Sequence, residues 1–551
     1  MKRAAAAPIV AIAFLLDALA LVLAVVIVAI AITGGGIFDV GGTRISARSV
    51  GNPLVALLLI GLVRYALAGA PASLARRCAS LVRGTHDRLA RLTAGQAWRI
   101  VLTLSLLTLA VKLANAWGHP GFFSGDDVEV QEMSLAALFD VSWPAWTLRS
   151  AFFPMVFIHP AHVTLAAMGL TDPATLVAAG RTVVAVLSTL TVIFVFVGAR
   201  RHDGVAPAIL AAFLAATSHL LVSFGGTELP RPIAAALVAG AFALLLHRST
   251  AASMIGGVLV GIAAALRFSE AVFVVPAAGM LMIERRWRDA AVCVVAVTAT
   301  ALAIQAVSDQ LYWGTPFYSV RHAIDYTLVE RQSTRGFQPL WHYVTTIPEW
   351  SGVAIVAVAV FAAIRGGWRP ALWAGVPLVA LSVLPHKEAR YLIPIVPFVS
   401  MLGGAGLWRL IVRASSPGAM PAWPSIAIVG GVVASTLLSI NGYHVRRSDA
   451  AVSLARSVAG TPGVSGVAVE QLWRWGGRIY LGRLPALQEL DGRLARPEDL
   501  ATLAQDLSIS IIALRTETCA RLGCAEVLGR AGLEERVSAD SSNAEYRVFA
   551  R

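Results

Sequence analysis

Long apolar stretches constrain this chain more than any other feature of its sequence. Stretches of about 17 to 25 mostly apolar residues, each long enough to cross a hydrocarbon core of about 30 Å, recur from near residue 8 to near residue 441. Of the 551 residues, 57% are hydrophobic and only 14% are charged, which is unlike soluble domains. The sequence therefore predicts a mainly α-helical, polytopic transmembrane bundle with about thirteen spans.

The net charge of +13 follows from topology and does not indicate nucleic-acid binding. Arginines gather in short loops between the apolar stretches, most densely in residues 76–99, as cytoplasmic loops do. The loop at 118–154 is acidic and is therefore expected outside. A tight hairpin near residues 267–270 keeps the later basic loops on the cytoplasmic side, and it places 309–349 and the segment around 386–390 outside.

Three parts are expected along the chain. Residues 1–98 form two N-terminal transmembrane helices and a basic cytoplasmic loop, and residues 99–445 form the transmembrane domain that carries the candidate site. Residues 446–551 alternate short β-type runs with helical ones, which indicates a small extracytoplasmic α/β domain. Cys519 and Cys524 in this tail can form a local disulfide only if the tail faces an oxidising compartment, and a pair of ordinary thiols is the alternative.

Adjacent carboxylates, Asp126 and Asp127, follow a predicted span in the acidic loop. Such a pair can remove a proton from a hydroxyl or bind a divalent cation, and the alternative is a solvated loop that caps a helix. Arg149 lies in the aromatic segment that follows. It is either a ligand for a phosphate oxygen or an arginine that reaches to the membrane interface.

The outer loop at 309–349 is rich in aromatic residues. Tyr312, Trp341, His342 and Tyr343 suit the faces of a sugar, but composition alone favours the aromatic belt of a membrane protein. Ionisable residues near the membrane interior are further candidates for substrate binding. Glu228 and Arg267 belong to this class, although Arg231 and Glu270, each three residues away, are available to neutralise them.

A charged segment, His386-Lys387-Glu388-Ala389-Arg390, separates two apolar stretches. Only three of the 45 basic residues are lysines, so Lys387 is not the default cation of this chain. At the outer end of a span, Lys387 and Arg390 are candidates to bind a lipid-linked phosphate, with His386 or Glu388 orienting them. The alternative is a charged hinge whose residues pair with one another.

The stretch "PHKEARYLIPIVPF" resembles the His-Lys-Glu-x-Arg-aromatic signature of glycosyltransferase family 22, which contains dolichyl-phosphate-mannose-dependent α-mannosyltransferases. Other segments occur in the order seen in that family: "GDD", "LRSAFFP", Thr227-Glu228, "DQLYWG" and "GFQPLWHYVTTIPEW". The resemblance covers roughly residues 99–415. The family usually has Asp-Glu where this chain has Asp126-Asp127, and Ser124 and Gly125 replace its histidine and proline.

The resemblance implies a GT-C fold and an inverting transfer of a sugar, mannose in the first instance, from a polyprenyl-phosphate carrier to a lipid or glycan acceptor. Asp126 or Asp127 would be the base, and both remain open. His386, Lys387, Arg390 and Arg149 would bind the donor phosphate, with no metal or cofactor expected. The extra N-terminal spans indicate a bacterial relative in the inner membrane, with the site outside the cytoplasm.

Two other functions compete with this interpretation. A transporter or flippase of lipid-linked saccharides is expected to carry charges at mid-membrane on an inverted repeat of broken helices, and the sequence shows no such repeat. A non-catalytic family relative is favoured by the altered first loop and disfavoured by the intact His-Lys-Glu-x-Arg segment.

Overall fold

A computed structural model describes residues 72–145, 149–330, 337–415, 448–536 and 545–551, together with isolated positions before residue 72 and between 430 and 436. A short antiparallel hairpin, β1 (Ile37–Val40) with β2 (Thr43–Ser46), lies among the described positions before residue 72. The two N-terminal spans and the last predicted span, which ends near residue 441, lie mostly outside the described residues.

Four helices in the described residues are long and apolar enough to cross a membrane. They are α4 (Ala94–Gly118), α7 (Pro173–Asp203), α13 (Trp287–Trp313) and the continuous run Ala389–Ser415, which comprises η5 (Ala389–Ile395) and α19 (Val396–Ser415). A fifth segment is bent by 55° between α8 (Val205–Ala216) and the run His219–Gly226, which contains α9 (His219–Ser223) and η2 (Phe224–Gly226).

Shorter apolar helices complete the bundle. One expected feature among them is the hairpin near Arg267, where α11 (Thr250–Leu266) ends and η3 (Phe268–Phe273) begins. Thr250 Oγ1 donates to Asp289 Oδ1 at 2.9 Å, and Arg286 Nη2 donates to the carbonyl of His247 at 2.7 Å. The chain therefore returns to the end from which it started, as predicted. The shorter helices that complete the bundle are α10 (Arg231–Leu245), α11 (Thr250–Leu266), η3 (Phe268–Phe273), α12 (Val274–Ile283), α17 (Val353–Ile364) and α18 (Trp368–Val383).

Small residues let the helices of the bundle pack closely, as is usual where lipid removes the hydrophobic driving force between helices. A Cβ at Gly257 of α11 would lie 2.6 Å from the carbonyl oxygen of Cys293 in α13. A Cβ at Gly404 of α19 would lie 2.5 Å from the backbone nitrogen of Ala211 in α8. Backbones thus meet directly at both crossings, and larger side chains would separate the helices.

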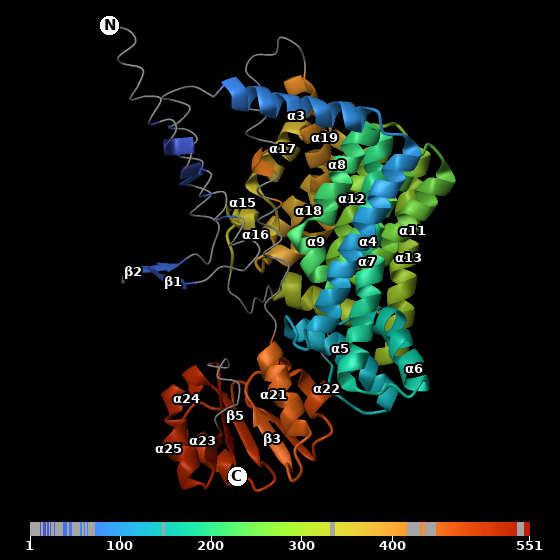
Figure 1. The fold of residues 1–551 in the computed structure, drawn as a ribbon. Helices are drawn as coiled ribbons and strands as arrows, with labels where there is room; N and C mark the ends of the chain where they lie inside the picture. Colours follow the sequence, from blue (N-terminus) through green and yellow to red (C-terminus); the bar gives the residue numbers. More distant parts are fainter. Residues whose placement is uncertain are drawn as a thin grey trace.

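The two ends of the bundle differ (Figure 1). Helix α3 (Ala72–Ala90) lies across one end, where α7 and α19 finish with Arg200, Arg201 and Arg413 in their last turns. The other end carries short helices that connect the long ones and face the C-terminal domain. They are α5 (Gly125–Phe139), η1 (Pro154–Ile158), α6 (His159–Ala167), α14 (Tyr318–Ile324) and η4 (Asp325–Val329). Two further short helices, α15 (His342–Thr345) and α16 (Ile347–Trp350), lie part-way along the bundle (Figure 1).

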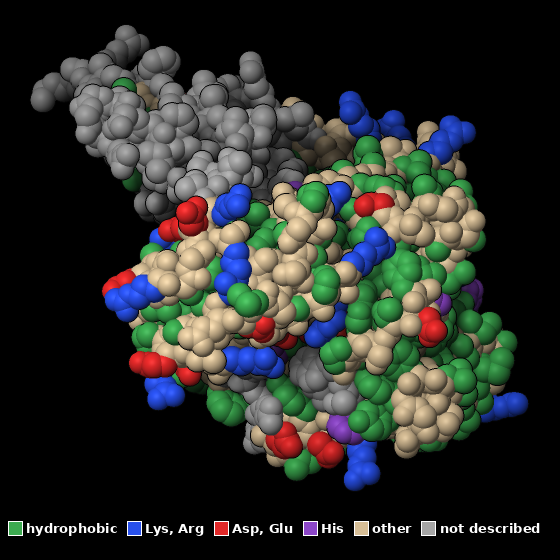
Figure 2. Space-filling model, turned by 90° about the horizontal axis from the view of Figure 1, so that it is seen from below, with side chains coloured by type: hydrophobic (Ala, Val, Ile, Leu, Met, Phe, Trp, Pro, Cys, Tyr) green, Lys and Arg blue, Asp and Glu red, His purple; other side chains and the backbone are tan. Residues whose placement is uncertain are grey.

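The C-terminal domain is a five-stranded sheet in the order β4-β3-β5-β7-β6 with helices on both faces. Strands β3, β4 and β5 are parallel, while β7 pairs antiparallel with both β5 and β6. Seen from this end, charged side chains of both signs are scattered among hydrophobic ones (Figure 2). Its elements are α21 (Asp449–Ala459), β3 (Gly466–Val469), η7 (Leu472–Trp475), α22 (Gly477–Leu481), β4 (Ala486–Glu489), α23 (Pro497–Ala504), β5 (Ile511–Arg515), α24 (Thr516–Leu522), α25 (Cys524–Arg530), β6 (Glu534–Arg536) and β7 (Tyr546–Ala550).

Two apolar layers form the core of this domain. Val467, Ala513 and Val548 point from the sheet toward α21 and the membrane bundle, whereas Ile512, Leu514 and Phe549 point toward α23, α24 and α25. Cys519 and Cys524 are joined by a disulfide between α24 and α25. The observed architecture confirms the expected fold class, a helical membrane bundle with a small C-terminal α/β domain.

Candidate active site

The two adjacent aspartates at the start of α5 have different environments. Asp127 is 0% exposed. Its Oδ2 accepts a hydrogen bond from the backbone N–H of Phe123 at 3.2 Å, and its Oδ1 accepts one from the hydroxyl of Ser124 at 3.3 Å. Because these bonds close the first turn of the helix, Asp127 has the role of a capping residue.

Asp126 has other partners, and 19% of its side chain is exposed. It forms an ion pair with Arg149 and lies with Oδ2 at 3.2 Å from Nη2 of Arg390. Burial by itself would raise the pKa of Asp126, but the guanidiniums of Arg149, Arg390 and Arg267 hold the pKa well below its ordinary range. Asp126 is therefore an ionised carboxylate with access to solvent.

The pKa of Asp127 moves in the opposite direction. Burial and the nearby charge of Glu228 raise the pKa to about 7, against the opposing effect of Arg390. Near neutral pH, Asp127 is thus partly protonated while Asp126 is fully ionised. The two carboxyl groups differ by environment and not by residue type.

The charged segment at 386–390 lies against these aspartates, which the sequence did not establish. Arg390 pairs with Glu388, and its Nη1 donates to the hydroxyl of Ser124 at 3.2 Å. His386 Nε2 lies 3.3 Å from the other oxygen of Glu388. Arg390 thereby joins the start of η5 to the start of α5.

Lys387 points away from this group. Its Nζ donates to the carbonyls of Gln338 at 2.8 Å and Leu384 at 2.5 Å, and burial lowers its pKa. In the geometry described, Lys387 ties the segment before α15 to the end of α18. Arg149, the partner of Asp126, also pairs with Glu129: its Nε lies 2.6 Å from the carboxylate of Glu129, on the next turn of α5.

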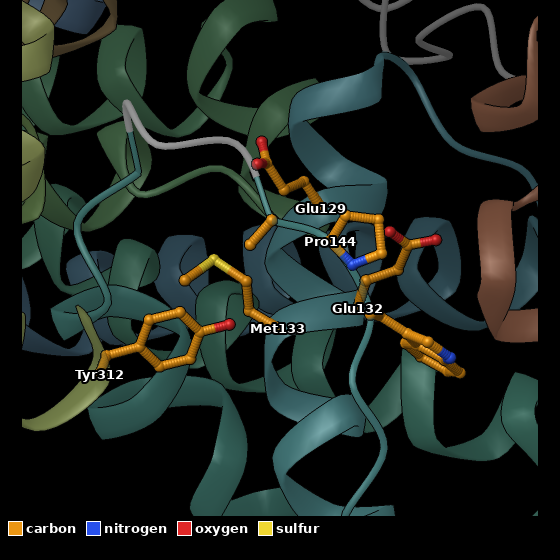
Figure 3. Close-up of a pocket in the computed structure, with 7 residues that line it drawn as sticks. Glu129, Glu132, Met133, Pro144 and Tyr312 are labelled. Carbon is orange, nitrogen blue, oxygen red and sulfur yellow. The ribbon is translucent and has the colours of Figure 1, made fainter. Parts of the chain in front are cut away.

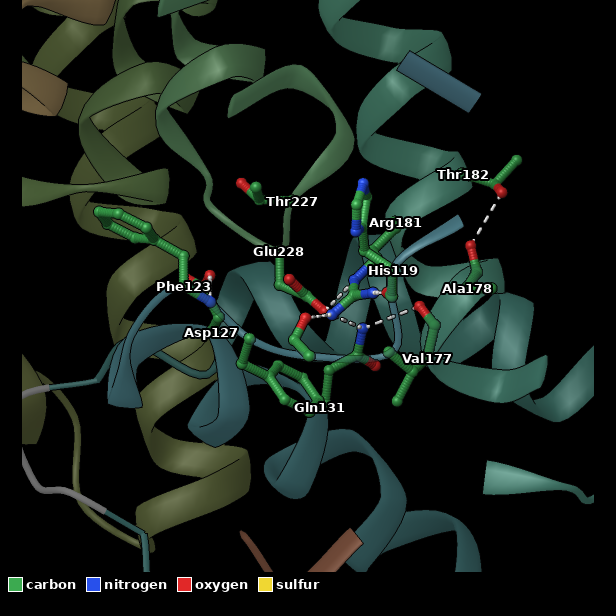
Figure 4. Close-up of polar contacts among 12 residues, drawn as sticks. His119, Phe123, Asp127, Gln131, Val177, Ala178, Arg181, Thr182, Thr227 and Glu228 are labelled. Atoms are coloured by element: carbon green, nitrogen blue, oxygen red, sulfur yellow. Dashed lines mark hydrogen bonds and ion pairs between the residues drawn. The ribbon is translucent and has the colours of Figure 1, made fainter. Parts of the chain in front are cut away.

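A buried network lies behind Asp127 (Figure 4). Arg181 of α7 is 1% exposed, and its Nε lies 2.5 Å from Glu228 Oε1. The same guanidinium donates to the carbonyls of His119 and, at 2.8 Å, Gly121. Sequence reasoning selected Glu228 and missed Arg181, although an arginine within the otherwise apolar run at 173–199 was an available signal.

A second cluster surrounds the aromatic residue that follows the charged segment. Arg231 lies 3.3 Å from Glu270, and its guanidinium is 3.8 Å from the ring centre of Tyr391. Arg267 lies 5.9 Å from the same ring. Arg267, at the hairpin bend, is also near enough to Asp126 for its charge to lower the pKa of that carboxyl.

The aromatic candidates of 309–349 are not brought together. Tyr312 lines a hollow with Glu129, Glu132, Met133 and Pro144, next to the carboxylates of α5 (Figure 3). Tyr343 is 1% exposed and packs in the core of the bundle, whereas Trp341 is 63% exposed. The neighbouring His342 lies in α15 with its ring 5.5 Å from that of Tyr343.

Groups of three or more His, Cys, Asp or Glu side chains with the spacing of a metal site do not occur among the described residues. The carboxylates near Asp126 are instead paired with arginines, as the distances above show. Such pairs stabilise the negative charge of the carboxylates through hydrogen bonds from guanidinium groups.

Solved structures share this fold at low sequence identity. ArnT from Cupriavidus metallidurans bound to undecaprenyl phosphate superimposes with a TM-score of 0.56 and 15% identity over 83% of this chain and 98% of that one. The archaeal oligosaccharyltransferase AglB from Archaeoglobus fulgidus, in complex with an inhibitory peptide and a dolichol-phosphate, gives 0.50 and 12% over 79% and 72%. These likenesses establish the GT-C fold that the sequence predicted.

Sequence comparison identifies the family. A mannosyltransferase of Drosophila melanogaster, the Dol-P-Man:Man(7)GlcNAc(2)-PP-Dol alpha-1,6-mannosyltransferase, is 27% identical over 187 residues, which are 32% of this chain and 26% of that protein. The alignment thus spans about a quarter of the relative. The family match begins after the aspartates of α5 and includes Arg149, Glu228, Arg267 and the segment at 386–390. Over residues 142–450 the chain matches, and therefore belongs to, the Alg9-like mannosyltransferase family.

Proposed function

We propose that this protein is an inverting membrane glycosyltransferase that moves mannose from a polyprenyl-phosphate carrier to a hydroxyl of a lipid or glycan acceptor. The observation that carries the proposal is the position of Asp126. An ionised, partly exposed carboxylate lies between Arg149 and the arginine of the His-Lys-Glu-x-Arg segment. A base and cations thus lie within one site, and transfer to or from a phosphate requires both.

In the proposed reaction, the acceptor oxygen attacks the anomeric carbon from the face opposite the phosphate. The bond between that carbon and the phosphate oxygen breaks, and the electron pair leaves with the phosphate monoester of the carrier. The proton of the acceptor hydroxyl passes to Asp126. One bond forms and one breaks at the anomeric carbon, and its configuration inverts because the new bond forms on the face opposite the leaving phosphate.

Asp126 is proposed as the base in preference to Asp127. Both oxygens of Asp127 already accept hydrogen bonds within the first turn of α5, and the side chain has no exposed surface. Asp126 is ionised near neutral pH and accessible. A general base must reach its substrate before its pKa matters.

The departing phosphate is proposed to lie beside Arg267, Arg149 and Arg390, where guanidiniums stabilise the charge that develops. Arg267 lies 5.9 Å from the ring of Tyr391, and its charge helps to lower the pKa of Asp126. His386 and Glu388 orient Arg390 in this scheme. Lys387 acts indirectly, by fixing the backbone that precedes Glu388.

The site and the C-terminal domain are proposed to lie outside the cytoplasm, in the inner membrane of a bacterium. Arginines in the last turns of α7 and α19 lie at the opposite end of the bundle, which the positive-inside rule assigns to the cytoplasm. The disulfide between Cys519 and Cys524 agrees, because disulfides persist in oxidising compartments.

The test is transfer by the purified protein in detergent, with polyprenyl-phosphate-mannose, -glucose and -arabinose offered separately and the product analysed. We expect a mannosylated product with inverted configuration from the first donor. Transfer only from another sugar would correct the donor. Absence of bond cleavage in detergent, together with movement of intact lipid-linked saccharide across the bilayer of reconstituted vesicles, would replace the enzyme by a flippase.

A further inference from the structure

The segment that enters α5 is bonded to the C-terminal domain. Asp449, the first residue of α21, accepts a hydrogen bond at Oδ1 from the backbone N–H of Gly121 at 2.8 Å, and its Oδ2 lies 2.7 Å from His119 Nδ1. Ser448 N–H donates to the carbonyl of Phe122 at 3.1 Å, while the hydroxyl of Ser448 accepts from the Phe122 N–H at 3.2 Å. The two segments, 121–122 and 448–449, are thus held together by backbone groups of both.

This pairing leaves no room for a side chain at Gly121. A Cβ there would lie 2.4 Å from the backbone nitrogen of Asp449. On the side of the membrane bundle, Arg181 donates to the carbonyl of the same glycine at 2.8 Å. The residues just before Asp126 are therefore fixed between α7 and the C-terminal domain.

A second contact lies further along the same helix. Glu132 Oε1 accepts a hydrogen bond from the backbone N–H of Arg478 at 2.5 Å, and Glu132 Oε2 lies 3.7 Å from the guanidinium of Arg478. Gly477, the first residue of α22, has φ +61°. A Cβ at Gly477 would lie 2.2 Å from Glu132 Oε1 and 2.5 Å from Val128 Cγ1.

Apolar side chains fill the space between these two polar contacts. Phe122, Val128 and Leu135 of the membrane domain belong to one buried cluster with Trp475, Ile479 and Tyr480 of the C-terminal domain. Burial of large aromatic and aliphatic side chains supplies most of the stability of such a contact. Asp126 lies between the two polar contacts, on the part of α5 that this cluster supports.

We propose that the C-terminal domain positions the base: by fixing α5 at Gly121 and at Glu132, it keeps Asp126 between Arg149 and Arg390. The inference rests on the proposed function, since it assigns Asp126 to the reaction. Asp449, Gly477 and Glu132 are then positioning residues and do not touch substrate. A displacement of about 1 Å at a reacting group costs on the order of 100-fold in rate, so this contact is a means of controlling catalysis.

Two glycines of the C-terminal domain provide a matched test. Gly477 and Gly492 both have positive φ, +61° and +70°, so alanine strains the backbone similarly at both. The Cβ of Gly477→Ala collides with Glu132, whereas the Cβ of Gly492→Ala meets no atom within 4 Å. Both variants are compared in the full-length protein by kcat, by the KM for donor and by hydrogen exchange of residues 121–132.

We expect faster hydrogen exchange and a kcat lower by about 100-fold in Gly477→Ala with an unchanged donor KM, and wild-type behaviour in Gly492→Ala. Asp449→Ala should follow Gly477→Ala, and Asp449→Asn should recover most of the rate because its amide oxygen still accepts from Gly121. Faster exchange with an unchanged kcat would overturn the inference and leave the proposed function intact. Absence of transfer by the wild-type protein would instead remove the proposed function and, with it, this role for the domain.

Discussion

The guanidinium of Arg390 lies 3.2 Å from the carboxylate of Asp126, and this ion pair joins the start of η5 to the start of α5. Each residue lies in a charged segment between apolar stretches, where burial makes an unpaired charge costly. Their contact places the base proposed here beside the arginine that the family signature contains.

Asp126→Asn should reduce transfer by about 100-fold to 10,000-fold, the range associated with a general base. Asp127→Asn should retain measurable transfer, because its neutral amide resembles the protonated form that a pKa of about 7 makes accessible. Initial rates with polyprenyl-phosphate-mannose measure both. Asp140→Asn, at the left-handed C-cap of the same helix, is the control and should behave like the wild type. Equal losses in all three variants would contradict the assignment.

Arg390→Lys should shift the pH dependence of kcat. Arg390 is one of the cations that lower the pKa of Asp126, and a lysine ammonium does not reproduce the paired contacts of guanidinium with Asp126 and Glu388. The pKa of Asp126 should therefore rise, so activity on the acidic side should be lost at a higher pH than in the wild type. Arg365→Lys, at the end of α17, is the control. An acidic limb that stays in place would show that Arg390 does not act on the base.

The stability of the protein should fall as pH rises from about 5 to 8, and Glu132 should cause part of this change. Burial raises the pKa of Glu132 to about 7 despite the opposing bond and charge of Arg478. The folded state therefore binds this proton more tightly than the unfolded state, and the stabilisation is lost as pH passes the folded pKa. Thermal unfolding at several pH values should give a flatter dependence for Glu132→Gln. Asp127 titrates in the same direction, so some dependence should remain.

Arg181→Met should destabilise the protein by about 3 kcal/mol, because it leaves Glu228 charged and buried without its partner. Adding Glu228→Gln should restore part of the loss, since the remaining amide carries no charge. A double-mutant cycle from unfolding in detergent measures the coupling. If Arg181→Met and the double variant are as stable as the wild type, the buried pair of Arg181 and Glu228 does not contribute to the stability of the folded protein.

Orientation can be tested with one cysteine at each end of the bundle. Leu507, in the C-terminal domain, is 78% exposed, and Arg248, before α11, is also exposed. In intact cells, a membrane-impermeant maleimide should label Leu507→Cys at once and Arg248→Cys only after permeabilisation. The reverse pattern would place the proposed site in the cytoplasm and invalidate the topology.

Several features could be predicted from the sequence because they depend on local composition. Apolar length predicted the membrane helices, and the spacing of basic loops predicted the hairpin at Arg267, which the bonds of Thr250 and Arg286 confirm. The alternation of short apolar runs predicted the C-terminal α/β domain. The sequence motif at residues 385–398 indicated the family, which the match over residues 142–450 establishes.

Other features depend on contacts between distant segments, and these were decided only by the tertiary structure. Asp126 and Asp127 are chemically identical. Their pKa values differ because burial and Glu228 act on Asp127, whereas arginines outweigh the effect of burial on Asp126. The sequence makes Lys387 a candidate for the donor phosphate, and only the tertiary structure shows that its ammonium donates to the carbonyls of Gln338 and Leu384.

Sequence alone determined that this chain enters a membrane, folds as a helical bundle and carries charged residues at one end of it, because hydrophobic length and charge are properties of short segments. Tertiary structure decided which charges meet: Arg390 with Asp126, Arg181 with Glu228, and Glu132 with Arg478. The physical reason is that a carboxylate acquires its pKa, its partner and its access to solvent from groups brought together by folding, and sequence separation does not record those distances.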